Sequence, residues 1–378
     1  MYHVKTMNKI SKIGLAELDD RFEISDTMEH EDAILVRSAK LHDYASPAEL
    51  LCIARAGAGV NNIPLDRAAE AGIVVFNTPG ANANGVKELT IAALLLASRK
   101  ISQGITWVKE QAAAGADVAA VVEKGKAAYV GPEIQGKTLG VVGLGAIGVL
   151  VANAAAALGM QIVGYDPFLS VQHALNLTPG VKVVSTLEEL YGQADYISLH
   201  LPMTPETKGT LNDAAFAAMK DGVRIVNLAR GELVDTEALK AALASGKCAA
   251  YVTDFPNSET AAMEGVVAIP HLGASTPESE DNCAMMAARQ VRDYLDNGNI
   301  VNSVNLPVLS MAWAAKNRVC VLTKGADAAA IAAAVPAVAS ASKTRGEYGY
   351  FLLDTDAQVD TDAIAALPGV LRVRVLHQ

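Results

Sequence analysis

The stretch 139-LGVVGLGAIG-148 decides the fold. Its first four residues are an apolar run with strand character, and glycines follow at the spacing G-x-G-x-x-G. A helical run, 147-IGVLVANAAAALG-159, comes directly after them. A strand, a glycine turn and a helix in this order are typical of the phosphate-binding turn of dinucleotide-binding domains.

Each residue type in this turn has a physical reason to be there. Gly143 permits the tight turn, Gly145 lets the backbone approach a pyrophosphate, and Gly148 lets helix and strand pack closely. The helix from Ile147 offers free N–H groups and a positive dipole, which attract an anion. The turn therefore predicts a pyrophosphate site.

The next strand, 161-QIVGYD-166, ends in an acidic residue at roughly the spacing of 20 residues that such sites use. Asp166 can accept hydrogen bonds from both hydroxyls of an adenosine ribose, and its charge repels a 2′-phosphate. No arginine follows in 166-DPFLSVQ-172. The predicted cofactor is NAD rather than NADP.

Short β-rich runs alternate with alanine-rich helical runs on both sides of this stretch, which favours parallel α/β layers. Three strands are predicted before it, and five come after the fingerprint strand: 33-AILVR-37, 51-LCIARA-56 and 73-IVVFN-77, then 161-QIVGYD-166, 195-DYISLHL-201, 223-VRIVNLA-229, 249-AAYVTDF-255 and 266-VVAIPH-271. We therefore predict an α/β fold with two doubly wound parallel-sheet domains, a Rossmann-type cofactor domain and a flavodoxin-like substrate domain.

The last part of the chain, from about residue 317, has a different order of elements. It alternates strand, helix, strand, strand, helix and strand, which is the ferredoxin-like βαββαβ layout. The predicted domains are residues 1–100 for substrate, with 285–306 returning to them, 101–284 for NAD, and 307–378 at the C-terminus.

Composition excludes several classes of protein. The net charge of −10 argues against a nucleic-acid partner. The four cysteines lie far apart and form no CxxC pair, so neither a zinc site nor a disulfide framework is expected. The longest apolar candidate, 89-LTIAALLLAS-98, is shorter than the roughly 18 residues of a membrane span, and no signal peptide is recognisable. We expect a cytoplasmic protein that binds no membrane.

Polar residues stand at the ends of four later strands, where ligands bind in open α/β sheets. These are His200 with Leu201 and Pro202, Arg230 after Ala229, Asp254, and His271, and Glu259 follows in a loop. Each residue alone is as compatible with a structural role as with a functional one. Together, behind a dinucleotide turn, they predict a hydride-transfer site.

Oxidation of a hydroxy acid by hydride transfer needs three kinds of group. The first is a cation that holds the anionic substrate. Arg230 suits this task, because the N–H groups of a guanidinium can bind a carboxylate or a carbonyl oxygen. His271 suits the general acid/base, since an imidazole titrates near neutral pH. Glu259 suits the carboxylate that orients such an imidazole.

In these motifs, from about residue 30 to 307, the chain resembles the D-2-hydroxyacid dehydrogenase superfamily. The resemblance rests on 143-GLGAIG-148, 199-LHLP-202, 227-NLARGELVD-235, 254-DFPNSE-259 and 270-PHLGAST-276 in this order. It implies that Arg230, Glu259 and His271 are catalytic. It also implies a cofactor site made of Gly143, Gly145, Ala146, Ile147, Gly148, Asp166, His200, Leu201, Pro202, Leu228, Ala229, Asp254, Gly273 and Ala274.

Within the superfamily the chain most resembles the branch that oxidises 3-phospho-D-glycerate at the start of serine synthesis, through 36-VRSAK-40, 55-RAGAGVNNI-63 and 76-FNTPGANANGVKELT-90. This implies a phosphorylated 2-hydroxy acid as substrate and a homodimer or homotetramer. The implied substrate-binding residues are Arg37, Ser38, Arg55, Gly57, Ala58, Gly59 and Lys126, the last in its own subunit or across a dimer. The segment around Lys126 lacks the tryptophan that relatives often have.

The C-terminal part resembles an ACT domain, a small regulatory module. Its first loop, 323-TKGADAAA-330, lacks the Asn-x-Pro-Gly type of sequence of serine-binding versions, so assembly is an alternative role. Other functions remain open: reduction of glyoxylate, hydroxypyruvate or another 2-keto acid, and a non-catalytic NAD-sensing scaffold. Formate enzymes differ, because they have a glutamine where Glu259 stands.

Overall fold

The computed structural model describes all residues, 1–378, and the chain divides into two compact units. The first unit comprises residues 1–82 and 277–378, and the second comprises residues 83–276. Each unit is described by itself below. The three functional domains expected at 1–100, 101–284 and 307–378 remain a prediction.

The second unit contains a seven-stranded sheet in the order β12-β11-β10-β9-β6-β7-β8. All its neighbouring strands pair in parallel. The order reverses between β6 and β9, which confirms the predicted Rossmann-type domain. The strands are β6 (Thr138–Val142), β7 (Gln161–Tyr165), β8 (Lys182–Val183), β9 (Tyr196–Leu199), β10 (Val223–Asn227), β11 (Cys248–Thr253) and β12 (Val266–Ala268).

Helices cover both faces of this sheet, because successive residues of each strand point to opposite sides. Val141 joins the core beneath α3 (Ala83–Ser98) and α6 (Ala146–Ala157). Val142 joins the core beneath α8 (Leu187–Gln193), α9 (Asp213–Ala218) and α10 (Thr236–Ala244). A short helix, α7 (Val171–Leu175), follows β7.

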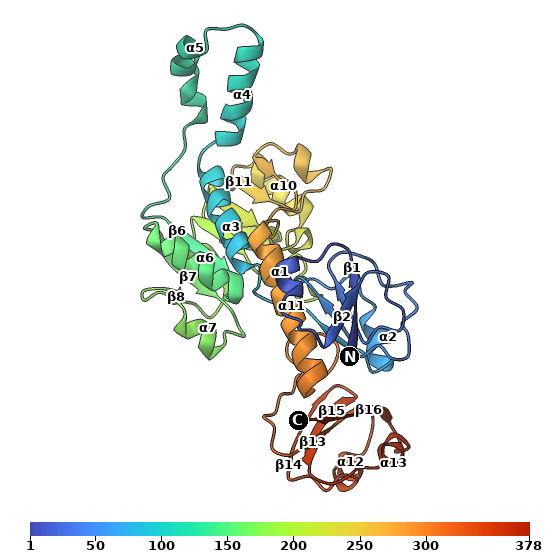
Figure 1. Cartoon of the computed structure of the whole chain (residues 1–378). Coiled ribbons are helices and arrows are strands. Elements are labelled where there is room, and N and C mark those ends of the chain that lie inside the picture. Colours follow the sequence, from blue (N-terminus) through green and yellow to red (C-terminus); the bar gives the residue numbers. More distant parts are fainter. The chain divides into compact units, whose positions relative to one another are not determined.

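Two consecutive helices of the second unit bury no residue, and they are followed by a short turn. They are α4 (Ile101–Ala113) and α5 (Val118–Gly125), followed by the 3-10 turn η1 (Lys126–Tyr129). The pair extends away from the rest of its unit (Figure 1). Trp107 and Tyr129 hold it together, with ring centroids 5.5 Å apart.

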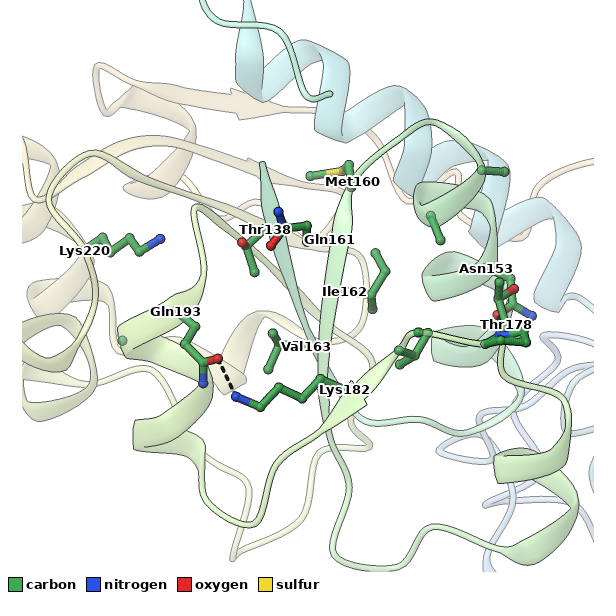
Figure 2. Close-up of a pocket in the computed structure, with 16 residues that line it drawn as sticks. Thr138, Asn153, Met160, Gln161, Ile162, Val163, Thr178, Lys182, Gln193 and Lys220 are labelled. Carbon is green, nitrogen blue, oxygen red and sulfur yellow. Dashed lines mark hydrogen bonds between the residues drawn. The ribbon is translucent and has the colours of Figure 1, made fainter. Parts of the chain in front are cut away.

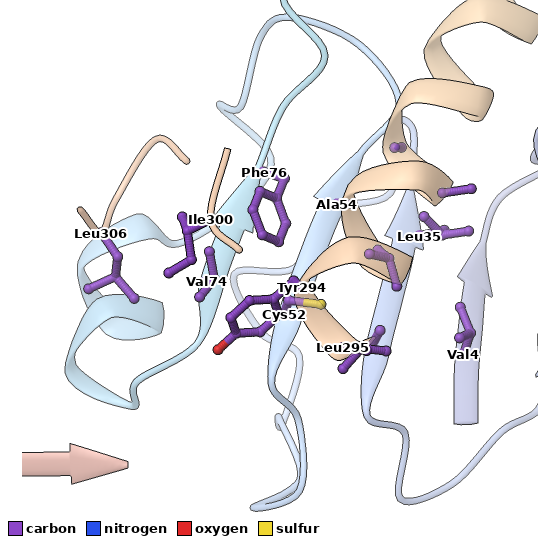
Figure 3. Close-up of a cluster of buried hydrophobic side chains, with 14 of the residues drawn as sticks. Val4, Leu35, Cys52, Ala54, Val74, Phe76, Tyr294, Leu295, Ile300 and Leu306 are labelled. Atoms are coloured by element: carbon purple, nitrogen blue, oxygen red, sulfur yellow. The ribbon is translucent and has the colours of Figure 1, made fainter. Parts of the chain in front are cut away.

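The first unit contains a five-stranded parallel sheet in the order β2-β1-β3-β4-β5, which confirms the predicted flavodoxin-like domain. Its strands are β1 (Tyr2–Met7), β2 (Phe22–Ser25), β3 (Ala33–Val36), β4 (Cys52–Arg55) and β5 (Val74–Phe76). The helices are α1 (Lys12–Leu15), α2 (Leu65–Glu70) and the long α11 (Pro277–Asn297). Apolar side chains of α11 pack onto the strands of this sheet around Phe76 and Tyr294 (Figure 3).

The C-terminal part of the first unit has the predicted βαββαβ order. It consists of β13 (Asn317–Lys324), α12 (Ala328–Ala333), β14 (Ala339–Arg345), β15 (Tyr348–Thr355), α13 (Thr361–Ala365) and β16 (Val370–His377). The antiparallel sheet has the order β14-β15-β13-β16. Ile331 and Ile364 of its two helices cover one face, while Tyr350 and Leu376 on the sheet join the core around α11.

A buried ion pair fixes the connection between α11 and this C-terminal sheet. Arg318 and Asp354 are fully buried, and the guanidinium Nε donates to the carboxylate at 2.7 Å. Arg318 also donates to the main-chain carbonyls of Asn297, Met311 and Ala312. These bonds tie the end of α11 and the linker to one side chain.

No helix of the chain combines the length and the apolar character that crossing a bilayer requires.

Candidate active site

The fingerprint turn lies where the strand order of the second unit reverses. Gly143 has φ +94°, a conformation that favours glycine. A Cβ on Gly143 would come within 2.6 Å of the main-chain oxygen of His200, in the loop after β9. The turn after β6 and the loop after β9 therefore touch, as the dinucleotide crevice of such folds requires.

The other two glycines of the fingerprint differ in their surroundings. A Cβ on Gly148 would lie 1.9 Å from the main-chain oxygen of Gly143, so helix and turn pack too closely for any side chain. A Cβ on Gly145 would meet no atom within 4 Å. Open space therefore lies beside the N-terminus of α6, where a pyrophosphate would bind.

Asp166 follows β7 and turns back to the fingerprint. One carboxylate oxygen accepts the N–H of Leu144 at 2.9 Å, and the other accepts the N–H of Phe168 at 2.8 Å. The acidic group is therefore fixed beside the glycine turn, where the ribose of a dinucleotide would lie. The turn and the acidic residue fit the dinucleotide for which they were predicted. The residues concerned are Gly143, Gly145, Gly148 and Asp166.

His200 is uncharged at neutral pH. Burial lowers the pKa of His200 to about 4, and its Nε2 is hydrogen bonded to the hydroxyl of Ser198 at 2.9 Å. A neutral imidazole suits a wall of a cofactor pocket, where a buried charge without a partner would be costly. Leu201 and Pro202 continue this loop.

The loop that carries Arg230 is held by a residue to which the sequence analysis gave no role. Asn227 is fully buried at the end of β10, and its amide donates to the main-chain oxygen of Arg230 at 2.8 Å. Its side-chain oxygen accepts the N–H groups of Ala229 and Arg230. Asn227 therefore fixes the backbone of the loop after β10, and a polar residue at the buried end of a strand is the signal that would have found it.

Asp254 joins two loops and keeps one oxygen without a partner. The residue is buried at the end of β11, and its Oδ2 accepts the N–H of Gly273 at 2.9 Å. Burial raises the pKa of the Asp254 carboxyl above its usual range. Its Oδ1 is buried and has no hydrogen-bond partner in the chain. An unsatisfied buried acceptor is costly, so this oxygen fits a donor supplied by a bound cofactor.

Arg230 and His271 come together around one aromatic ring. The guanidinium carbon of Arg230 lies 5.3 Å from the centroid of the Phe255 ring. The imidazole centroid of His271 lies 4.3 Å from the same ring. Two of the three residues predicted to be catalytic therefore lie close together at the carboxyl ends of β10 and β12.

The third residue, Glu259, has another partner. Its carboxylate lies 3.4 Å from the amino group of Lys240 on α10, and about half of its side chain is exposed. No ion pair within 4.0 Å joins Glu259 to His271. Asn257 caps the turn that leads into η3 (Thr260–Ala262) and fixes the backbone of Glu259 there. Its predicted role in orienting His271 remains a prediction.

The predicted substrate-binding residues of the first unit lie at the ends of β3 and β4. Arg37 forms an ion pair with Glu280 at 2.6 Å. The Nε of Arg55 donates to the main-chain oxygen of Arg37 at 3.1 Å. The N–H of Ser38 donates to the side chain of Asn8 at 3.0 Å.

The backbone cradle predicted at residues 57–59 is only partly available for an anion. The N–H of Gly57 donates to the main-chain oxygen of Arg55 at 2.9 Å, which leaves the N–H groups of Ala58 and Gly59. In the second unit, Lys126 is exposed and pairs with Glu123 at 2.5 Å.

A cavity of about 930 Å³ lies at the opposite end of the seven-stranded sheet. Figure 2 shows it lined by Thr138, Gln161 and Lys182, the first residues of β6, β7 and β8. Lys182 is hydrogen bonded to Gln193 at 2.8 Å, so this polar group is already satisfied. The cavity is remote from the fingerprint turn, which lies at the carboxyl ends of the strands.

The strand order, the glycine turn and the fixed acidic residue define a dinucleotide-binding protein of the Rossmann type. Residues 91–273 match the family model described as the NAD-binding domain of D-isomer specific 2-hydroxyacid dehydrogenases. Residues 91–273 therefore belong to this family of NAD-binding domains, and NAD is the cofactor.

The sequence is also similar to those of several named dehydrogenases. D-3-phosphoglycerate dehydrogenase of Rattus norvegicus is 38% identical over 291 residues, covering 75% of this chain and 52% of that protein. The enzyme of the same name from Mycobacterium leprae is 40% identical over 299 residues, covering 76% and 53%. The chain thus spans about half the length of these relatives. The crystal structure of NAD⁺-bound 3-phosphoglycerate dehydrogenase of Entamoeba histolytica is 28% identical and covers 82% of this chain and 99% of that chain, with a TM-score of 0.62.

Proposed function

We propose that the protein oxidises 3-phospho-D-glycerate to 3-phosphohydroxypyruvate with NAD. The observation that carries the proposal is the placement of Arg230 and His271 around Phe255, at the end of the NAD-binding sheet where ligands bind. The relatives named above are 3-phosphoglycerate dehydrogenases, which supports this choice of substrate.

In this mechanism each side chain has one task. Arg230 holds the carboxylate of the substrate and the oxygen that becomes a carbonyl, because its fork of N–H groups matches two oxygens. His271 takes the hydroxyl proton onto an imidazole nitrogen as the C–H bond breaks. NAD, when bound, accepts the hydride. Glu259 would orient His271 only after its carboxylate leaves Lys240.

The phosphate is assigned to cations and amides. In the proposal Arg37, Arg55 and Lys126 attract it, and Ser38 with the amides of Ala58 and Gly59 binds anionic oxygens. Arg37 must release Glu280 to do this. The ion pair is partly exposed, and exposed pairs contribute only about 0–1 kcal/mol, so a doubly charged phosphate can compete for the guanidinium.

One observation favours a second candidate, reduction of an unphosphorylated 2-keto acid such as glyoxylate or hydroxypyruvate. The positive charge of Arg37 is already neutralised by Glu280. If this pair persists in the working enzyme, the first unit offers less positive charge to a phosphate.

Initial rates of NADH formation with 3-phospho-D-glycerate test the proposal. Arg230→Ala and His271→Ala are each expected to lower kcat/KM by at least about 10²-fold, the usual contribution of positioned acid–base and charge-stabilising groups. Full activity in either variant would contradict the mechanism.

Arg37→Ala separates the two candidates. We expect it to abolish turnover of the phosphorylated acid and to spare unphosphorylated acids. Arg289→Ala is the matched control, because Arg289 also pairs with one glutamate on the surface of the first unit, Glu17 at 2.8 Å. An Arg37→Ala variant that keeps its turnover of the phosphorylated acid would favour the second candidate.

We also propose that the protein is a homo-oligomer in the cytoplasm. The helices α4 and α5 bury no residue although they expose apolar side chains, with Ile105 52% exposed. Covering such a surface requires a partner, and a second copy of the chain supplies one. The four cysteines are free and buried, which suits a reducing compartment.

A further inference from the structure

Phe255 contacts both side chains on which the proposed chemistry depends. The Arg230 guanidinium lies over its ring at 5.3 Å, and the His271 ring lies at 4.3 Å with a tilt of 46°. The motif 254-DFPNSE-259 places Phe255 directly after the buried Asp254. Phe255 is not among the residues that the sequence motifs predict to be functional.

The backbone of Phe255 is fixed on two sides. Its N–H donates to the hydroxyl of Thr253, a fully buried residue at the end of β11, at 3.0 Å. A Cβ on Gly231 would lie 3.2 Å from the main-chain oxygen of Phe255 and 3.6 Å from its Cβ. The loop after β10 therefore packs closely against the loop after β11, and a side chain at position 231 would make a tight contact.

The ring has the physical properties needed to hold its two neighbours. The face of an aromatic ring attracts a guanidinium, and tilted contacts between aromatic rings are favourable. Glu259 is paired with Lys240, and no carboxylate forms an ion pair with His271. In this structure the ring of Phe255 is packed against the imidazole, and Asp254 is the acidic residue that interacts with His271 electrostatically.

We propose that Phe255 is a positioning residue that sets the spacing of Arg230 and His271 for hydride transfer. The proposal rests on the proposed function, since it assigns the ring to the same site. A phenylalanine that only filled space would tolerate leucine, which has similar apolar character but offers no π face. A positioning ring tolerates tyrosine and not leucine.

Two measurements test the proposal on the whole chain of residues 1–378. The first is the ¹H–¹³C spectrum of the protein labelled at histidine, in which a ring at 4.3 Å shifts the imidazole protons of His271. His271→Gln assigns the resonance. Phe255→Leu should move it toward the position of an exposed histidine, Phe255→Tyr should leave it in place, and Phe216→Leu, a buried residue on α9, is the matched control.

The second measurement is steady-state kinetics with NAD and the 2-hydroxy acid that the wild type oxidises. Phe255→Leu should lower kcat by about 10²-fold, the order of loss that a 1 Å misplacement causes, with KM for NAD unchanged. Phe255→Tyr should restore most of kcat. Phe216→Leu should leave kcat unchanged.

The outcomes separate this inference from the proposed function. A wild type that oxidises no 2-hydroxy acid defeats the proposed function, and with it the positioning role, while the spectrum still reports whether the ring contacts His271. An active wild type with an unmoved resonance in Phe255→Leu, an unchanged kcat in that variant, or a Tyr variant no better than Leu overturns the inference.

Discussion

Asp166 is a carboxylate whose position bears on the proposed choice of cofactor. Its two oxygens accept the N–H groups of Leu144 and Phe168, so the acidic group is held beside the glycine turn before any cofactor arrives. A fixed negative charge at this position admits a ribose with free hydroxyls and repels a phosphorylated one. We therefore propose that the choice of NAD over NADP rests on the charge of Asp166 rather than on shape.

Asp166→Asn tests this argument. The amide keeps an acceptor for a backbone N–H but removes the charge, so we expect the NAD-to-NADP ratio of kcat/KM to fall by about tenfold or more, since about 1.4 kcal/mol corresponds to a factor of 10. The measurement is kcat/KM with both cofactors. Asp195→Asn is the control, because this carboxylate also accepts a backbone N–H, from Thr138, at the opposite end of the sheet. An unchanged ratio in Asp166→Asn would contradict the charge argument.

At the scale of residues, the sequence predicted which groups are near one another better than which groups pair. Arg230 and His271 follow strands of one parallel sheet, so their proximity follows from topology. The partner of Glu259 depends on the path of an irregular loop, which turns into η3 and brings the carboxylate to Lys240. Phe255 was missed because an apolar residue beside a strand gives no chemical signal.

At the scale of elements, two glycines of the fingerprint turn have different surroundings, and we expect different reasons for each. Gly148 serves packing, because its Cβ would lie 1.9 Å from the main-chain oxygen of Gly143. Gly145 faces open space and has φ −77°, which any residue adopts, so nothing in the fold itself requires glycine there. We expect glycine to be required at position 145 only when a pyrophosphate approaches.

A pair of variants tests this distinction. Gly148→Ala should lower the melting temperature by several degrees or prevent folding, because a Cβ cannot enter a close-packed contact without moving the backbone. Gly145→Ala should keep the melting temperature of the wild type and weaken NAD binding by at least about tenfold. Thermal unfolding and calorimetric titration with NAD measure the two effects. If Gly145→Ala bound NAD normally, the assignment of this turn to the pyrophosphate would be wrong.

The sequence predicted the strands with long apolar runs, such as β6 and β10, because burial on both faces leaves a continuous apolar pattern. It did not predict β1, β2 or β8. The two residues of β8 are exposed, and β1 includes a histidine and a lysine, so their pairing is decided by neighbouring strands rather than by their own composition.

At the scale of the whole chain, the first unit is stabilised by a polar group inside its core. Arg318 binds Asp354 and three main-chain oxygens, and its guanidinium lies 4.5 Å from the ring of Trp313. The sequence could not predict this pair, since the two residues lie on different strands and charged residues are seldom fully buried.

Arg318→Met should destabilise the protein by about 3–5 kcal/mol, because it leaves Asp354 as a buried charge without a partner. The double variant Arg318→Met/Asp354→Leu should recover part of this loss. Urea unfolding followed by circular dichroism measures both changes, and Arg21→Met, at an exposed ion pair with Asp296, is the control. Equal stability of the single and double variants would show that the buried charge is not the cause.

The packing of the C-terminal sheet against α11 limits how the chain can be divided. The side chain of Arg374 on β16 donates to the main-chain oxygens of Tyr294 and Leu295, and Tyr350 donates to that of Gly298. A chain cut before β13 would lose these hydrogen bonds and expose the apolar surface around them. The C-terminal part is therefore not an interchangeable module, and grafting it onto another dehydrogenase would require transplanting the end of α11 with it.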